Sequence, residues 1–183
     1  MKVSDVVIGA ARLVLNGTTV DKIIAGSQLT SEETNALNQL VRAYNTVLKE
    51  VAIEYSYLVS DETVSGGKVY YSALSHSPLK IIGATVDGEK AEYKVFPTYV
   101  LLPEKQTLLS YAYIPADKVL NDAFDYEGKP VGERAFIYGV AAEYCLASGR
   151  YNEAADWDSK YRKAAVPRYS GGAKRIKGRI WGL

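Results

Sequence analysis

The apolar residues between positions 37 and 51 recur at steps of three and four, the spacing that places side chains on one face of a helix. Thr30 precedes this run and is followed three residues later by Glu33. In a capping box of this kind, the threonine hydroxyl and the glutamate carboxylate each accept a hydrogen bond from the other residue's backbone amide. The pattern predicts a helix of about six turns. Its apolar positions are Leu37, Leu40, Val41, Tyr44, Val47, Leu48 and Val51.

A shorter helical pattern precedes this segment. Ala10 and Val14 recur at a helical step, and Ser4 is a residue type that caps helix starts. Asparagine followed by glycine commonly ends a helix, because both residues tolerate a left-handed backbone. We therefore expect the first helix to start at Ser4 and to stop at Asn16-Gly17.

Between positions 53 and 114 the chain is rich in aromatic and β-branched residues, which favour strands. Asp87-Gly88 lies between two apolar runs and predicts a tight hairpin, because both central residues of a type I′ turn need a positive φ. The spacing of the turn residues predicts a small antiparallel sandwich or barrel. Its expected strands are residues 53–59, 68–73, 79–86, 91–96, 98–102 and 107–114.

The helical pattern returns in the C-terminal third of the chain. Residues 122–132 have the composition of an exposed loop, and residues 131–148 have the small and apolar residues of a helix that Gly149 would end. Asn152 is expected to cap a second helix, and Pro167 prevents that helix from continuing.

These patterns together predict an α+β fold with a discontinuous helical bundle built from both chain ends. Residues 1–57 and 121–167 form the bundle, residues 58–120 form an inserted small antiparallel β domain, and residues 168–183 form an extended basic C-terminal arm. We expect one set of apolar residues from both ends to make the helical core. This set is Leu37, Leu40, Tyr44, Leu48, Tyr138, Ala142 and Trp157.

The charges are distributed unevenly along the chain. All 21 acidic residues lie in the first 159 positions, whereas the last 24 positions hold eight Lys and Arg and no acid. Such a basic end usually binds a negatively charged partner, either protein or nucleic acid. No run approaches the ~18–20 apolar residues needed to cross a bilayer. Cys145 is the only cysteine, which excludes an intramolecular disulfide and favours an intracellular origin.

The residue types that usually carry catalysis are scarce. His76 is the only histidine, and it lies in a turn-like Ser-His-Ser-Pro segment without a nucleophile elbow. One histidine and one cysteine cannot supply an N/S zinc site, and Cys145 on a helix indicates a buried structural thiol. No phosphate-binding glycine motif is present. We therefore expect no catalytic residue, no cofactor and no metal, and we interpret the chain as a structural protein rather than an enzyme.

Two segments near the C-terminus carry a resemblance to a known family. The first is Glu-Arg-Ala-Phe-Ile-Tyr-Gly-Val-Ala-Ala-Glu-Tyr-Cys-Leu at 133–146, and the second is Gly-Arg-Tyr-Asn-Glu-Ala-Ala-Asp-Trp-Asp at 149–158, followed by Tyr161 and Ala164. With the short helix, the long capped helix, the β insert and an arginine-bearing terminus at Trp181, the chain resembles the head–tail adaptors of tailed bacteriophages. Within these neck or connector proteins it is most similar to the tail tubular protein A type.

The resemblance implies a virion structural protein that is assembled in the host cytoplasm and located in the neck, between capsid and tail. Such proteins form a homo-oligomeric ring, commonly a dodecamer, that binds beneath the portal protein and continues its DNA channel. Downstream tail or neck proteins would be further partners, and DNA would pass without sequence-specific binding. The arm would then bind the portal or a neighbouring subunit. Its interface residues would be Arg168, Lys174, Arg175, Lys177, Arg179, Ile180 and Trp181.

A different class of function also fits the basic end. A nucleic-acid-binding module would use the Lys and Arg of the arm for phosphate contacts and Trp181 for base stacking. Such a module would bind DNA tightly as an isolated chain, with a steep dependence on salt.

Overall fold

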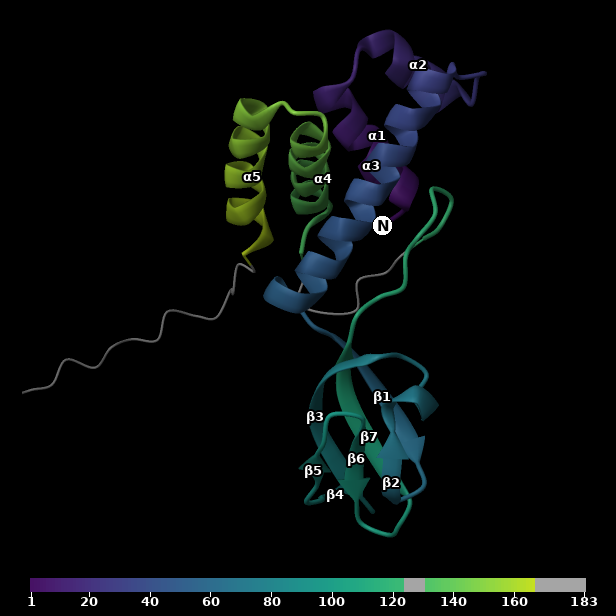
Figure 1. Cartoon of the computed structure of the whole chain (residues 1–183), viewed down its shortest axis with the longest axis vertical. Coiled ribbons are helices and arrows are strands. Elements are labelled where there is room, and N and C mark those ends of the chain that lie inside the picture. The colour runs from purple at the N-terminus through teal and green to yellow at the C-terminus, as the bar shows by residue number, and fades with distance from the viewer. Residues whose placement is uncertain (124–130, 167–183) are drawn as a thin grey trace, which may run out of the picture.

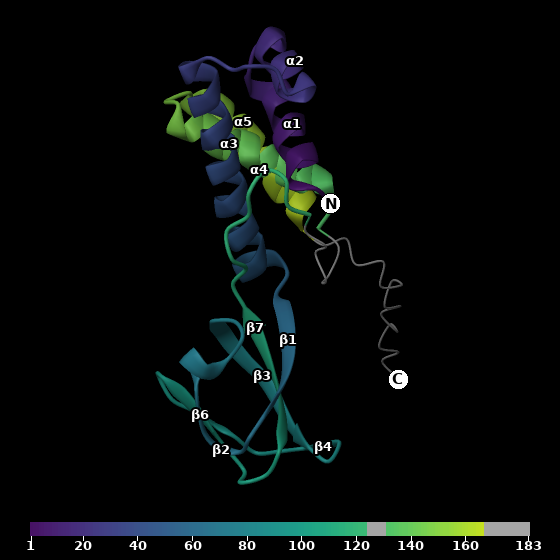
Figure 2. The ribbon, with the colours of Figure 1, turned by 90° about the vertical axis from the view of Figure 1, so that its right-hand side faces the viewer.

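The computed structural model describes residues 1–123 and 131–166 of the chain. The fold is a mixed α+β structure with the helices at one end and the strands at the other (Figure 1). The helices of the described residues are α1 (Val3–Val14), α2 (Gly17–Ala25), α3 (Ser31–Glu50), α4 (Glu133–Ala147) and α5 (Tyr151–Ala165). Figure 2 shows that α3 runs from the helical end toward the strands.

The helices share one apolar core, to which α1, α3, α4 and α5 all contribute buried side chains. At its centre, the rings of Tyr44 and Phe136 are fully buried and stack with their centroids 6.1 Å apart. Gly139 allows α4 to approach α3 closely, because a Cβ built there would lie only 2.8 Å from Cγ1 of Val47. A larger residue would therefore push these two helices apart.

The seven residues expected in the helical core differ in burial. Leu40, Tyr44 and Leu48 are completely buried in this core. Leu37, Tyr138 and Trp157 are partly buried and pack against its edge, where the Tyr138 and Trp157 rings stack 5.7 Å apart. The remaining residue, Ala142, is buried on the side of α4 that faces α5.

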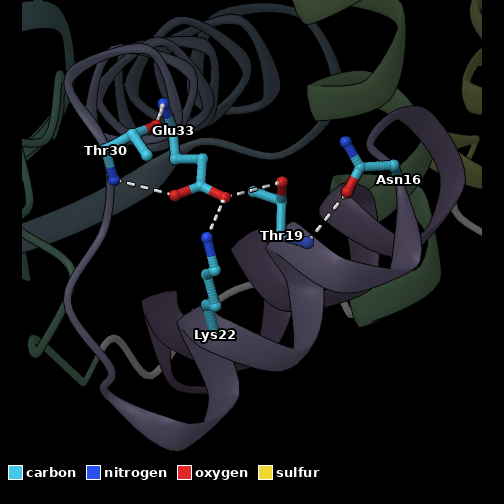
Figure 3. Close-up of polar contacts among 5 residues, drawn as sticks. All are labelled: Asn16, Thr19, Lys22, Thr30 and Glu33. Carbon is cyan, nitrogen blue, oxygen red and sulfur yellow. Dashed lines mark hydrogen bonds and ion pairs between the residues drawn. The ribbon is translucent and has the colours of Figure 1, made fainter.

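The capping box at the start of α3 is confirmed. The Glu33 amide donates to the Thr30 hydroxyl at 3.2 Å, and the Thr30 amide donates to the Glu33 carboxylate at 2.8 Å. The same carboxylate also joins α2 to α3, because it accepts hydrogen bonds from Lys22 Nζ at 2.7 Å and from the Thr19 hydroxyl at 3.3 Å (Figure 3). The Lys22 contact, followed by the Thr30 amide, lowers the pKa of Glu33 to about 2.

This contact predicts a specific acid sensitivity. The Glu33 pKa is about 2 in the folded chain and 4.5 without these partners. Its stabilising contribution is therefore fully present above pH 4.5 and is lost as the pH falls toward 2. We expect the free energy of unfolding of Glu33→Gln to vary less over this window than that of the wild type, measured by urea denaturation. Glu32→Gln, at an exposed position of the same turn, serves as the control; an equal change in both variants would contradict the prediction.

Three of the expected helix boundaries are wrong. Asn16 does not end a helix; it caps α2, and its side-chain oxygen accepts a hydrogen bond from the Thr19 amide at 2.9 Å. Ser4 lies inside α1, because the Val3 amide already donates to the Asp122 carbonyl at 3.0 Å and fixes an earlier start. Asn152 lies inside α5, which is preceded by Arg150.

The strands form two antiparallel sheets in the orders β1-β7-β3-β4 and β2-β6-β5. Their bounds are β1 Leu58–Val64, β2 Gly67–Tyr70, β3 Pro78–Val86, β4 Glu89–Lys90, β5 Lys94–Val95, β6 Tyr99–Leu102 and β7 Thr107–Tyr113. Buried residues of both sheets, including Val100 and Tyr111, make a second core that is separate from the helical one. We call the structure formed by β1 to β7 the β unit.

The hairpin at Asp87-Gly88 is confirmed, with φ of 53° and 85° at the two residues and β3 paired to β4 across them. Three strand predictions are wrong in extent. The expected strand 68–73 ends at Tyr70, because Tyr71–Ala73 forms a 3-10 helical turn. Val51–Tyr55 continues α3 as a π-helical turn, and β1 starts only at Leu58. Of the run 91–96, only Lys94–Val95 is a strand.

The β unit is joined to the helices by two adjacent stretches of chain. Leu58 at the start of β1 pairs with Tyr113 at the end of β7, so the chain enters and leaves the β unit side by side. The returning stretch is then held against α3. Asn45 donates to the Lys118 carbonyl at 2.9 Å and accepts from the Lys118 amide at 2.7 Å.

Candidate interaction surface

The residues best suited to chemistry have structural partners. The His76 ring stacks on Tyr113, with centroids 4.1 Å apart and planes inclined by 13°. Cys145 is completely buried, and its sulfur accepts a hydrogen bond from Arg150 Nη2 at 2.8 Å. The same guanidinium donates to the Val14 carbonyl at 3.0 Å, so Arg150 ties the α4–α5 turn to the end of α1.

Within residues 1–123 and 131–166, no group of three or more His, Cys, Asp or Glu side chains is arranged to hold a metal ion. The helices in these ranges also include none that combines the length and the apolar character needed to span a membrane.

A groove of about 350 Å³ runs between α4 and α5. We call it the α4–α5 groove. These two helices pack along each other (Figure 1). Small alanines keep the floor low, while Leu146 and Tyr151 stand at the end nearest the α4–α5 turn with 51% and 69% of their surfaces exposed. The lining residues are Ala142, Glu143, Leu146, Tyr151, Ala154, Ala155, Asp158 and Arg162.

The other end of the groove is acidic. Glu143 of α4 and Asp158 of α5 line it, and Arg162 binds Asp158 at 2.8 Å. Beyond them, Glu50 and Glu54 lie at the end of α3 and in the π-helical turn. We call these four carboxylates the acidic rim. The only cation that the described contacts place among them is Arg162.

The acidic rim is partly withdrawn from water. Burial, with added repulsion from Glu54 and Glu143, raises the pKa of Glu50. Burial, with repulsion from Asp158, raises the pKa of Glu143. Both shifts mean that these carboxylates are less stable as anions than they are in water, so a further cation at this place would stabilise them.

An exposed aromatic patch lies on the β2–β6 sheet. Lys68 Nζ lies 4.8 Å from the ring centroid of Tyr70 and 4.2 Å from that of Tyr99. Phe96 stacks on Tyr99 with centroids 4.5 Å apart. The stacked rings and the ammonium group that lies over them stabilise one another, so these aromatic side chains have favourable contacts within the sheet itself.

The predicted interface residues Arg168, Lys174, Arg175, Lys177, Arg179, Ile180 and Trp181 lie outside the described residues. Sequence reasoning missed the α4–α5 groove and its acidic rim. Leu146 and Tyr151 occupy ordinary helical positions. The pairing of α4 with α5 decides that these two side chains stay exposed while others are buried. The one available signal was the unbalanced acidity of the first 159 residues, which does not indicate where the acids gather.

No protein-family model and no curated protein matches the chain.

Proposed function

We propose that this chain is a structural, non-catalytic head–tail adaptor of a tailed bacteriophage. In this role it forms a ring beneath the portal and continues the DNA channel into the tail. The observation that carries the proposal is the α4–α5 hairpin. The segments at 133–146 and 149–164, which resemble the adaptor family, coincide with these two helices, and α4 packs against α1 and α3 as well as against α5.

The proposed architecture has residues 1–57 and 121–167 as one helical bundle, 58–120 as a β insert and 168–183 as a basic arm. Support comes from the apolar core that α1 and α3 share with α4 and α5. The pairing of Leu58 with Tyr113 is what an inserted unit needs, because its two ends must meet.

A ring requires a head-to-tail interface between unlike surfaces of neighbouring copies. Exposed apolar side chains occur at both ends of the molecule, and such groups are candidates for burial between subunits. Those on the helices include Leu13, Ile24 and Leu146, and those on the β1-β7-β3-β4 sheet include Val59, Ile82 and Leu108. Residues 1–159 carry an excess of acidic side chains, which would weaken the affinity of this part for DNA in the channel. Contacts of Lys and Arg with phosphate dominate that affinity.

The alternative is a nucleic-acid-binding module, and the unbalanced basic charge of the arm is the observation that favours it. The two functions differ in what the purified chain does. An adaptor assembles into closed rings and binds a portal, whereas the module binds DNA with an affinity that falls steeply as salt is raised.

The full-length chain should therefore be examined by mass photometry and negative-stain electron microscopy, alone and mixed with the portal of a tailed phage. We expect closed rings, stacked coaxially on the portal in the mixture. A chain that stays monomeric under both conditions and binds duplex DNA with a steep salt dependence would overturn the adaptor proposal in favour of the module.

A further inference from the structure

The α4–α5 groove has two chemically different ends. Near the α4–α5 turn it is apolar, with Leu146 and Tyr151 largely exposed and Ala155 beside them. Toward the end of α5 it is lined by Glu143 and Asp158. A peptide that fits this surface needs an apolar or aromatic anchor at one end and cations along the rest.

The acidic rim has more negative charge than its neighbours balance. Four carboxylates gather there, and Arg162 is the one cationic partner that the described contacts give them. At the base of the rim, the Tyr161 side chain is buried beside Glu50. Burial and the charge of Glu50 raise the pKa of Tyr161 further above its usual value. A cationic side chain placed at the acidic rim would therefore be stabilised by these groups.

The chain itself carries a segment with the complementary chemistry. Positions 168–183 contain five Lys and Arg and no acid, and these cations are followed by an Ile180-Trp181 pair. The cations come first in the chain and the aromatic anchor last. A segment that returned along α5 from its C-terminal end would meet the groove in the same order, with the acidic rim first and the apolar end second.

The length of this segment is sufficient for such a return. On an ideal helix Ala155 lies about 15 Å and Tyr151 about 21 Å from Ala165. Gly171-Gly172 is a turn signal located six residues past Ala165. From there, nine extended residues reach about 30 Å, which brings Trp181 beside Ala155 if the outward run spans less than about 15 Å.

We infer that, in the free chain, the α4–α5 groove binds residues 168–183 of the same molecule. Trp181 packs on Leu146, Tyr151 and Ala155, and the Lys and Arg that precede it pair with the acidic rim. A tether this short gives the segment an effective concentration in the ~mM range, which favours binding within the chain over binding between chains. The contact is a property of the isolated molecule and does not rest on the adaptor role.

The test uses the full-length chain with Trp157→Phe, which leaves Trp181 as its only tryptophan. Trp157 does not line the groove, and phenylalanine preserves an aromatic ring against Tyr138. We expect blue-shifted emission from Trp181 and acrylamide quenching several-fold weaker than that of a solvent-exposed indole. Adding either Ala155→Arg or Tyr151→Asp should restore full quenching, because the first blocks the apolar end and the second places a charge there.

The matched control is Ala25→Arg, which places the same side chain at an exposed alanine of α2. It should leave the protection of Trp181 unchanged, and far-UV circular dichroism should show that every variant is folded. High salt should weaken the protection, because the cation–carboxylate pairs are screened. Equal quenching in all variants would overturn the inference. Protection that disappears on dilution would also overturn it, because a second copy would then be supplying the segment.

Discussion

Replacing Phe136 by alanine should lower the free energy of unfolding by about 3–5 kcal/mol, the usual cost of truncating a large core aromatic. Phe136 is completely buried and stacks on Tyr44 of α3, so the substitution leaves a cavity at the contact between α3 and α4. Because α1, α3, α4 and α5 share one core, we expect the loss to reach helices from both ends of the chain.

Urea denaturation followed by circular dichroism measures the loss, and amide hydrogen exchange shows where it falls. Protection should decrease in α1 and α3 as much as in α4 and α5, while β7 should keep its protection because the β unit has its own core. Ile24→Ala, which truncates a half-exposed side chain of α2, is the control and should cost much less. Unchanged exchange in α1 and α3 would mean that the two groups of helices are independent.

Ending the chain after Pro167 should abolish stable attachment to the portal while leaving the body folded. The described helices and both cores lie within residues 3–165, so the truncation removes none of their buried contacts. It removes the five Lys and Arg and the Trp181 anchor, and loss of such an anchor alone often costs ~2 kcal/mol or more of binding free energy.

Portal pull-down and infectivity complementation measure attachment, and far-UV circular dichroism reports whether the body is folded. Trp181→Ala should weaken attachment without abolishing it, and its circular dichroism spectrum should match that of the wild type. Wild-type attachment by the truncated chain would show that the arm is not the portal contact.

The fold was most predictable where local signals are unambiguous. The capping box at Thr30 and the Asp87-Gly88 hairpin each depend on a few neighbouring residues, and both were predicted correctly. The predictions failed where one residue type serves opposite purposes. Asparagine is favourable at either end of a helix, and Asn16 caps the start of α2. The contacts of Thr19 and Lys22 with Glu33, which hold α2 against α3, form only in the folded chain.

Tertiary burial overrode local preference at the end of α3. The run that begins at Ile53 has the aromatic and β-branched composition of a strand, yet the helix continues to Tyr55. Val51 and Ala52 are fully buried there, and Tyr55 packs edge-to-face on Tyr161 with centroids 5.8 Å apart. Intrinsic β preference amounts to about 1 kcal/mol at most, which such packing exceeds.

The candidate site was only partly predictable for a related reason. The basic arm is visible in the sequence because its charges are contiguous. The α4–α5 groove is not, because α4 is apolar on nearly all sides: Phe136 faces the core, whereas Ala142 and Leu146 face the groove. Which side stays open is decided by the pairing with α5. The acidic rim depends on the same assembly, since it combines Glu50, Glu143 and Asp158 from three helices.

The double connection between α3 and the β unit has a mechanical consequence. One connection leaves α3 through the π-helical turn that ends at Tyr55, and the other is clamped to Asn45 by two hydrogen bonds and near it by the Lys49–Asp117 ion pair at 2.6 Å. On an ideal helix these anchor points are about 15 Å apart. A torque on the β unit is therefore resisted at two positions along α3 rather than at one.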